Sequence, residues 1–163
     1  MIVKLTQSDL EKARETAQYL VKYSAYDISD GQNPYKKYFT GAAGEIAVRK
    51  HFNLSIDNFA ADFETDKGKP DLVIQGLKVD VKSCIKKNGR DNLCICATAF
   101  KTVDVDYYFL CHFNDVDAVQ LVGYIDKASV KNKGRLIAKQ HKGKDRSYIL
   151  FSKHLMKPFK AKK

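Results

Sequence analysis

Two aspartates and a lysine occur within one short stretch of this chain, at spacings that could do chemistry. Asp71 follows Pro70, and Asp80 and Lys82 are separated only by Val81. Carboxylate oxygens are the ligands that hard divalent cations prefer, and an ammonium group is a compact positive charge suited to a phosphate. Held on one rigid backbone, these side chains would form a cradle for a divalent metal and a phosphate.

The pattern around these residues predicts a β-hairpin that would hold them in place. Leu72 and Ile74 alternate with Asp71 and Val73, and after Gln75-Gly76 the segment 77–82 alternates strictly between apolar and polar residues. Period-two alternation is typical of half-buried strands, and successive side chains on a strand point to opposite faces. We therefore expect the valines of the second segment to enter the core, while Asp80 and Lys82 project together on the other face.

A glutamate on a preceding helix is the third candidate acid. The segment 40–52 is predicted to be helical, with Thr40 as its N-cap and one apolar stripe. Glu45 lies on a different stripe, among small and apolar residues, because residues three and four apart are neighbours on a helix. The small residues ahead of Glu45 would let the helix approach the sheet closely. The alternative is an ordinary half-exposed helical glutamate.

The rest of the chain predicts an α/β fold, with one mixed sheet flanked by helices in a single domain, 1–163. A first helix should begin at a capping box, Ser8 to Glu11, and run to about Tyr23. Segments 27–38 and 53–69 read as loops. Further strands are expected at 93–97, 107–113, 120–125 and 147–151, and short helical turns at 98–102, 126–130 and 152–156.

The positive charge of the chain is concentrated near its C-terminus. The net charge is +10, and segment 127–163 holds 13 Lys or Arg residues against one acid, Asp145. A basic segment beside an acidic site predicts a surface that attracts a polyanion, and we expect nucleic acid rather than a membrane. For 157–163, a solvated basic tail is the favoured interpretation.

The start of the chain lacks the long apolar run of a signal peptide, and no stretch approaches the ~20 apolar residues that span a bilayer. We expect an intracellular (cytoplasmic) protein with no membrane partner. The four cysteines, at positions 84, 94, 96 and 111, form no Cys-x-x-Cys pair. Small buried residues are favoured over disulfides, and a zinc site built from Cys94, Cys96 and Cys111-His112 is the weaker alternative.

Glu45, the Pro70-Asp71 pair and the Asp80-Val81-Lys82 triplet together resemble the PD-(D/E)XK nuclease superfamily. The resemblance spans roughly residues 40–108 and implies a restriction-endonuclease-like core. The triplet begins with Asp where Glu is commoner, and the helix expected after the third strand is short here.

The resemblance also implies a function and a set of roles. The protein would be a Mg²⁺-dependent nuclease that hydrolyses DNA phosphodiester bonds, as a structure-selective or non-specific endonuclease. Asp71, Asp80 and the carbonyl of Val81 would hold Mg²⁺ or Mn²⁺, and Glu45 would complete the metal site or orient a water molecule. Lys82 would lie beside the scissile phosphate and steady the attacking group.

Several alternatives remain open from the sequence. Asp80 could belong to an exposed strand face that pairs with lysines, and Asp71 could be a plain turn residue. Ser83 could assist the reaction by hydrogen bonding. Within the same superfamily, a Holliday-junction resolvase fits the small size of the chain, and such enzymes are often homodimers. A DNA-binding module that kept the fold and lost turnover is the alternative from another class.

Overall fold

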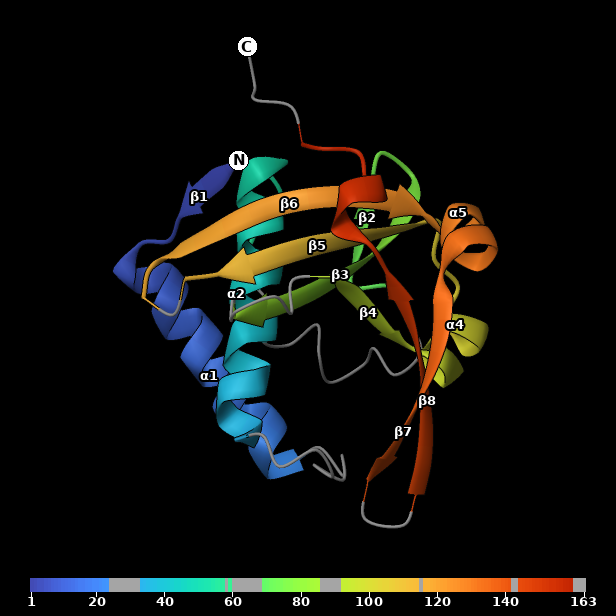
Figure 1. The fold of residues 1–163 in the computed structure, drawn as a ribbon. Helices are drawn as coiled ribbons and strands as arrows, with labels where there is room; N and C mark the ends of the chain where they lie inside the picture. Colours follow the sequence, from blue (N-terminus) through green and yellow to red (C-terminus); the bar gives the residue numbers. More distant parts are fainter. Residues whose placement is uncertain are drawn as a thin grey trace.

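The computed structural model describes residues 1–23, 33–57, 59, 69–85, 92–114, 116–141 and 144–159. In this part of the chain the protein has an α/β fold, with a mixed sheet flanked by helices (Figure 1). Its elements, in chain order, are β1 (Ile2–Lys4), α1 (Gln7–Tyr23), α2 (Pro34–His51), β2 (Leu72–Ile74), β3 (Leu77–Ile85), β4 (Leu93–Cys96), α4 (Ala97–Thr102), β5 (Tyr107–Phe113), β6 (Ala118–Asp126), α5 (Lys127–Lys133), β7 (Arg135–His141), β8 (Lys144–Phe151) and the 3₁₀ turn η1 (Lys153–Leu155).

The strands form two sheets. The larger sheet has the order β1-β6-β5-β3-β2, with β3 parallel to β5 and the other neighbours antiparallel. The smaller sheet, β4-β8-β7, is antiparallel throughout. The expectation of a single sheet was therefore wrong, because β4 and β8 pair with each other, and with the unpredicted strand β7, instead of joining the larger sheet.

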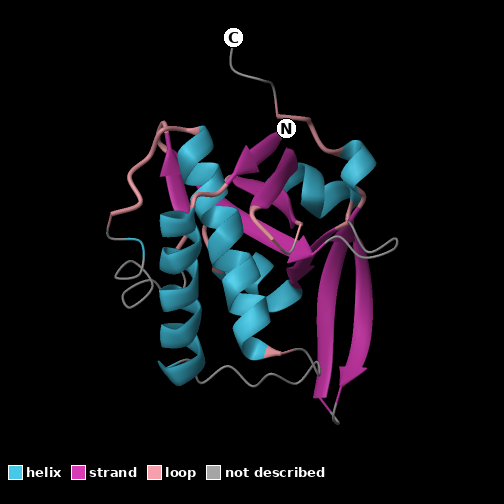
Figure 2. Ribbon diagram, turned by 90° about the vertical axis from the view of Figure 1, so that its left-hand side faces the viewer, coloured by secondary structure: helices cyan, strands magenta, loops and turns pink. Residues whose placement is uncertain are grey.

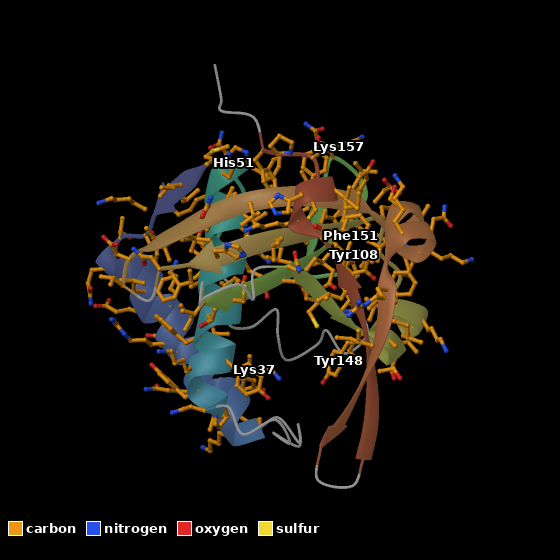
Figure 3. The ribbon with its side chains drawn as sticks, viewed as in Figure 1. Lys37, His51, Tyr108, Tyr148, Phe151 and Lys157 are labelled. Atoms are coloured by element: carbon orange, nitrogen blue, oxygen red, sulfur yellow. The ribbon has the colours of Figure 1, made fainter. Side chains whose placement is uncertain are left out.

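These elements are arranged in three layers, with one core on each side of the larger sheet (Figure 2). Helices α1 and α2 cover one face, and the smaller sheet with α4 and α5 covers the other. The first core contains Val79 and Val81, which are 1% and 6% exposed, so their predicted burial is confirmed. The second contains Tyr108 and Phe151, both labelled in Figure 3.

The predicted hairpin is confirmed. β2 and β3 pair antiparallel, and the two residues between them, Gln75 and Gly76, have φ values of 51° and 80°. Positive φ at both central positions is the geometry whose twist matches that of the flanking strands. The two arms are unequal, because β2 has three residues and β3 has nine.

Helix α1 begins one residue earlier than expected, and a different residue caps it. The hydroxyl of Thr6 accepts a hydrogen bond from the Asp9 N–H (3.2 Å), and the Thr6 N–H donates to the Asp9 carboxylate (2.7 Å). The capping box therefore joins Thr6 to Asp9, and the predicted box from Ser8 to Glu11 was wrong. Asp9 also pairs with Lys50, which ties α1 to α2.

Helix α2 begins six residues before its predicted start. The Asn33 side chain accepts from the Lys36 N–H (3.3 Å), and Pro34 occupies the first helical turn, where its missing N–H costs nothing. Thr40 is inside the helix and donates its hydroxyl to the Lys36 carbonyl, so its prediction as N-cap was wrong. Residues 34–38 are helical rather than a loop, and 27–32 lie outside the described residues.

Strands β4, β5, β6 and β8 and helices α4 and α5 confirm the later predictions, whereas β1 and β7 were not predicted. No helix in the described ranges is long and apolar enough to cross a membrane.

The C-terminal segment packs on the body of the protein. Lys157 exchanges backbone hydrogen bonds with Tyr124 (2.8 and 2.9 Å), and Figure 3 shows His51 and Lys157 at the same end of the molecule. The ring of Phe159 lies 5.0 Å from that of Phe109 and 5.8 Å from that of His51. The solvated-tail interpretation was wrong for Phe159, which is half-buried, whereas Lys157 and Pro158 are exposed; 160–163 lie outside the described residues.

Candidate active site

Close contact between α2 and β3 fixes the position of Glu45. A Cβ atom on Gly44 would lie 1.7 Å from the Ser83 hydroxyl, so only glycine allows the helix to come this near to the strand. The next residue, Glu45, is 8% exposed. The half-exposed interpretation of Glu45 was therefore wrong. The Ser83 hydroxyl is buried with no hydrogen-bond partner among the described residues, so it makes no hydrogen bond to the acids.

The unequal hairpin directs Asp71 towards β3. Leu72 opposite Val79 is the last residue pair of the β2–β3 ladder, so the next position places Asp71 opposite Asp80. The β2–β3 ladder does not continue past Leu72, and the N–H of Val81 donates to the Asp71 carboxylate (2.7 Å) instead of to a backbone carbonyl of β2. The N–H and C=O of one strand residue point to the same side of the strand. The Val81 carbonyl therefore faces the side on which Asp71 lies.

Asp80 and Lys82 share a face of β3, as alternation predicted. Their side chains form an ion pair with 2.5 Å between Lys82 Nζ and Asp80 Oδ1. The Asp80 side chain is 10% exposed and that of Lys82 33% exposed, so the pair opens to solvent on the lysine side. The burial of Asp80 does not fit the alternative of an exposed strand face, although the pairing with a lysine that this alternative expected is present.

Glu45, Asp71, Asp80 and Lys82 interact electrostatically, and we call them the acidic cluster. Burial, and then the charge of Asp71, raises the pKa of Glu45 well above its usual range. Burial, and then the charge of Asp80, raises the pKa of Asp71 to about 8. Burial lowers the pKa of Lys82, but the three carboxylates outweigh it and the pKa is raised. One ammonium cannot balance three carboxylates, so the cluster retains protons.

The acidic cluster fits a divalent cation by donor chemistry. Three carboxylates and the Val81 carbonyl are all oxygen donors, which suits Mg²⁺ or Mn²⁺. In the part of the chain that the structure describes, no three Asp, Glu, His or Cys side chains are spaced as a ready-made metal site. The reason is local, because Asp71 accepts from Val81 and Asp80 from Lys82. These two carboxylates would have to turn towards a shared ion.

Two further residues near the acidic cluster were not singled out from the sequence. Arg49 lies one helical turn after Glu45 and opposes the rise in its pKa. The sequence signal for Arg49 was its spacing of four residues from Glu45 on the same helix. Tyr108 lies beside Asp80 in the parallel register of β3 and β5, and burial together with the Asp80 charge raises its pKa. No sequence signal gives this register.

A hollow of about 500 Å³ adjoins the acidic cluster at Asp71. We call it the Arg49 hollow; its lining residues are Arg49, Leu54, Ser55, Lys69, Pro70, Asp71, Leu72 and Val73. Two of them are cationic, Asp71 is acidic, and four are apolar.

One cysteine lies near the acidic cluster, because burial and then the charges of Cys84 and Glu45 raise the pKa of the Cys111 thiol. Cys111 is buried, Cys84 and Cys96 are half-buried, and Cys94 is exposed; all four are free thiols. The prediction of small buried residues is confirmed for Cys111 and was wrong for Cys94.

The site thus takes one residue from α2, one from the start of the hairpin and two from β3. Compared with known proteins, the chain matches no family model, no curated protein and no solved structure.

Proposed function

We propose that the protein is a metal-dependent deoxyribonuclease of the PD-(D/E)XK type, with a restriction-endonuclease-like core. The observation that carries the proposal is the convergence of Glu45, Asp71 and Asp80 on one lysine in a largely buried site. The order helix, hairpin, parallel strand also supports it, because α2 and the β2–β3 hairpin precede β5, which runs parallel to β3.

The residues of the acidic cluster would have separate roles in phosphodiester hydrolysis. Asp71, Asp80 and the Val81 carbonyl would hold Mg²⁺ or Mn²⁺ together with Glu45. When bound, the metal lowers the pKa of water and neutralises charge that builds on the phosphoryl oxygens. The Lys82 ammonium has a raised pKa and stays charged, so it would offer a positive group to the scissile phosphate from the exposed side of the cluster.

Basic residues near the C-terminus support DNA as the substrate. Segment 127–163 includes α5 and the β7–β8 hairpin, which projects from the body of the molecule (Figure 1). Its 13 Lys or Arg residues would attract phosphates, and such binding weakens steeply as salt rises. A flat salt response would count against this segment as a DNA surface.

The test is cleavage of supercoiled, linear and four-way-junction DNA, with Mg²⁺ and with chelator. We expect cleavage with Mg²⁺ that disappears in chelator and in Asp80→Ala. Preference for the junction would identify a resolvase-type enzyme, and a dimer in solution would support that assignment. DNA binding without cleavage by the wild-type protein would overturn the nuclease proposal and leave a DNA-binding module.

A further inference from the structure

The Arg49 hollow is lined by both cationic and apolar residues, and it lies next to the acidic cluster. Arg49 and Lys69 supply the charge, and Leu54 and Leu72 are among the apolar residues. At about 500 Å³ the hollow lies within the size range of small-ligand sites. A lining with both cationic and apolar residues suits a nucleotide, because the phosphate is charged while the sugar and base present apolar surface.

Arg49 is held in place by its neighbours. Its Nη1 donates to the Ser55 carbonyl (3.0 Å), and its guanidinium carbon lies 5.4 Å from the centre of the Phe59 ring. A guanidinium already held in this way loses little freedom when it binds a phosphate, and its planar fork matches phosphate oxygens. Arg49 also follows Glu45 by four residues, about 6 Å along the helix axis.

Asp71 connects the hollow to the acidic cluster. Its carboxylate accepts from Val81, and Asp71 is also a lining residue of the hollow, while Lys69, which is exposed, stands two residues before it. A strand with its scissile phosphate at the acidic cluster would therefore bring a neighbouring nucleotide to the hollow.

We propose that the Arg49 hollow binds the phosphate of the nucleotide next to the scissile bond, with Arg49 and Lys69 as its cationic contacts. This inference rests on the proposed function and names a second contact of the same substrate. The phosphate has two sources, a 5′-terminal monophosphate or an internal phosphodiester. A terminal phosphate held there would favour cutting close to a strand end, and an internal one would favour cutting within the strand.

The test compares two lysine variants in DNA binding. Lys69→Gln removes a charge from the hollow. Lys4→Gln is the matched control, because Lys4 is an exposed lysine on β1, at the opposite edge of the larger sheet from β2. Affinity is measured by fluorescence anisotropy in chelator, so that no strand is cut. Three DNAs are used: a duplex with 5′-phosphates, the same duplex with 5′-hydroxyls, and a closed circle without ends, the last by competition.

We expect Lys69→Gln to weaken binding several-fold and to reduce the slope of log K against log salt by about 0.9, the value of one phosphate contact. A loss confined to the 5′-phosphate duplex assigns the terminal monophosphate. An equal loss on all three DNAs, larger than that of Lys4→Gln, assigns the internal phosphodiester. If the two variants change affinity and slope alike on every DNA, the hollow holds no phosphate and the inference is wrong.

Cleavage with Mg²⁺, measured on the same preparations, separates the two proposals. If the wild-type protein cleaves DNA and the two lysine variants bind DNA alike, only the proposed phosphate contact is overturned. A wild-type protein that binds DNA with the expected Lys69 effect but never cuts it overturns the nuclease, and the phosphate contact stands as a feature of a DNA-binding module.

Discussion

Strand β3 carries two lysine–aspartate ion pairs, four residues apart, in different surroundings. At its beginning Lys78 pairs with Asp104, and these side chains are 45% and 79% exposed. In its middle Lys82 pairs with Asp80, and these are 33% and 10% exposed. The residue types are the same, so their chemistry is set by the elements that surround them.

The two regions shift the pKa of an aspartate in opposite directions, although the pKa of the lysine is raised in both. At the exposed pair each partner favours the charge of the other, so the pKa of Asp104 is lowered and that of Lys78 is raised. In the acidic cluster, burial and neighbouring acids raise the pKa of Asp71 instead. An exposed pair is complete with two charges. The acidic cluster has three carboxylates and one ammonium, so a further cation would balance its charge. This excess of acids marks a candidate site.

Mg²⁺ gives the largest expected difference between the two regions. With Mg²⁺ at 100 times its Kd, the folded state gains about 2.7 kcal/mol, which at about 2–4 °C per kcal/mol is a rise in Tm of about 5–10 °C. Asp104→Asn should keep this rise and Asp80→Asn should lose it. Thermal melts at pH 8 with and without Mg²⁺ measure it. An equal rise in both variants would mean that the ion binds elsewhere.

The pH dependence of stability should also separate the regions. The folded pKa of Asp71 is about 8, above its unfolded value near 4, so between these pH values the folded protein keeps a proton that the unfolded chain has released. In chelator, stability should therefore fall as pH rises through this window, lowering Tm by several degrees. Asp71→Asn should flatten the fall.

Asp104→Asn is the control for this pH series. The pKa of Asp104 is lowered, so its contribution is present above about pH 4 and is lost only on acidification. The variant should therefore keep the wild-type fall between pH 5 and 8. A wild-type Tm that does not fall there would contradict the raised pKa of Asp71.

The glycine contact that brings Glu45 to β3 provides a smaller effect. Gly44→Ala would press a methyl group into Ser83 and should destabilise the fold by about 1–3 kcal/mol. Gly41→Ala has open space and should be neutral or stabilising by up to about 1 kcal/mol. Urea unfolding measures both. Partial recovery in Gly44→Ala with Ser83→Gly would identify the contact, and a Gly44→Ala variant as stable as Gly41→Ala would contradict it.

The exposed pair should give the smallest effect. Removing Asp104 with Asp104→Ala leaves Lys78 in water, where a single ion pair contributes little. We expect a Tm equal to that of the wild type within the error of the melt, and unchanged DNA cleavage. A clear fall in Tm or in DNA cleavage would remove the contrast between the beginning and the middle of β3.

Local patterns predicted the hairpin and the shared face of Asp80 and Lys82, because a period of two is a property of neighbours in the sequence. The small residues ahead of Glu45 indicated that the helix could approach the sheet, but the burial of Glu45 depends on a contact between Gly44 and Ser83, which are far apart in the sequence, so the burial itself could not be predicted. Strand β1 is three residues long and its pairing with β6 is non-local. The start of α2 was predictable, since Asn33-Pro34 is a helix-start signal as well as a turn signal.

Phe159 ties the end of the chain to the end of helix α2. Its ring is packed against Phe109 of β5 and against His51 and Phe52, at the last turn of the helix that carries Glu45. A shortened protein that stops before Lys157 would lose the ring of Phe159 and these contacts. Truncation or tagging at this terminus would therefore alter the support of the Glu45 carboxylate, about two helical turns away.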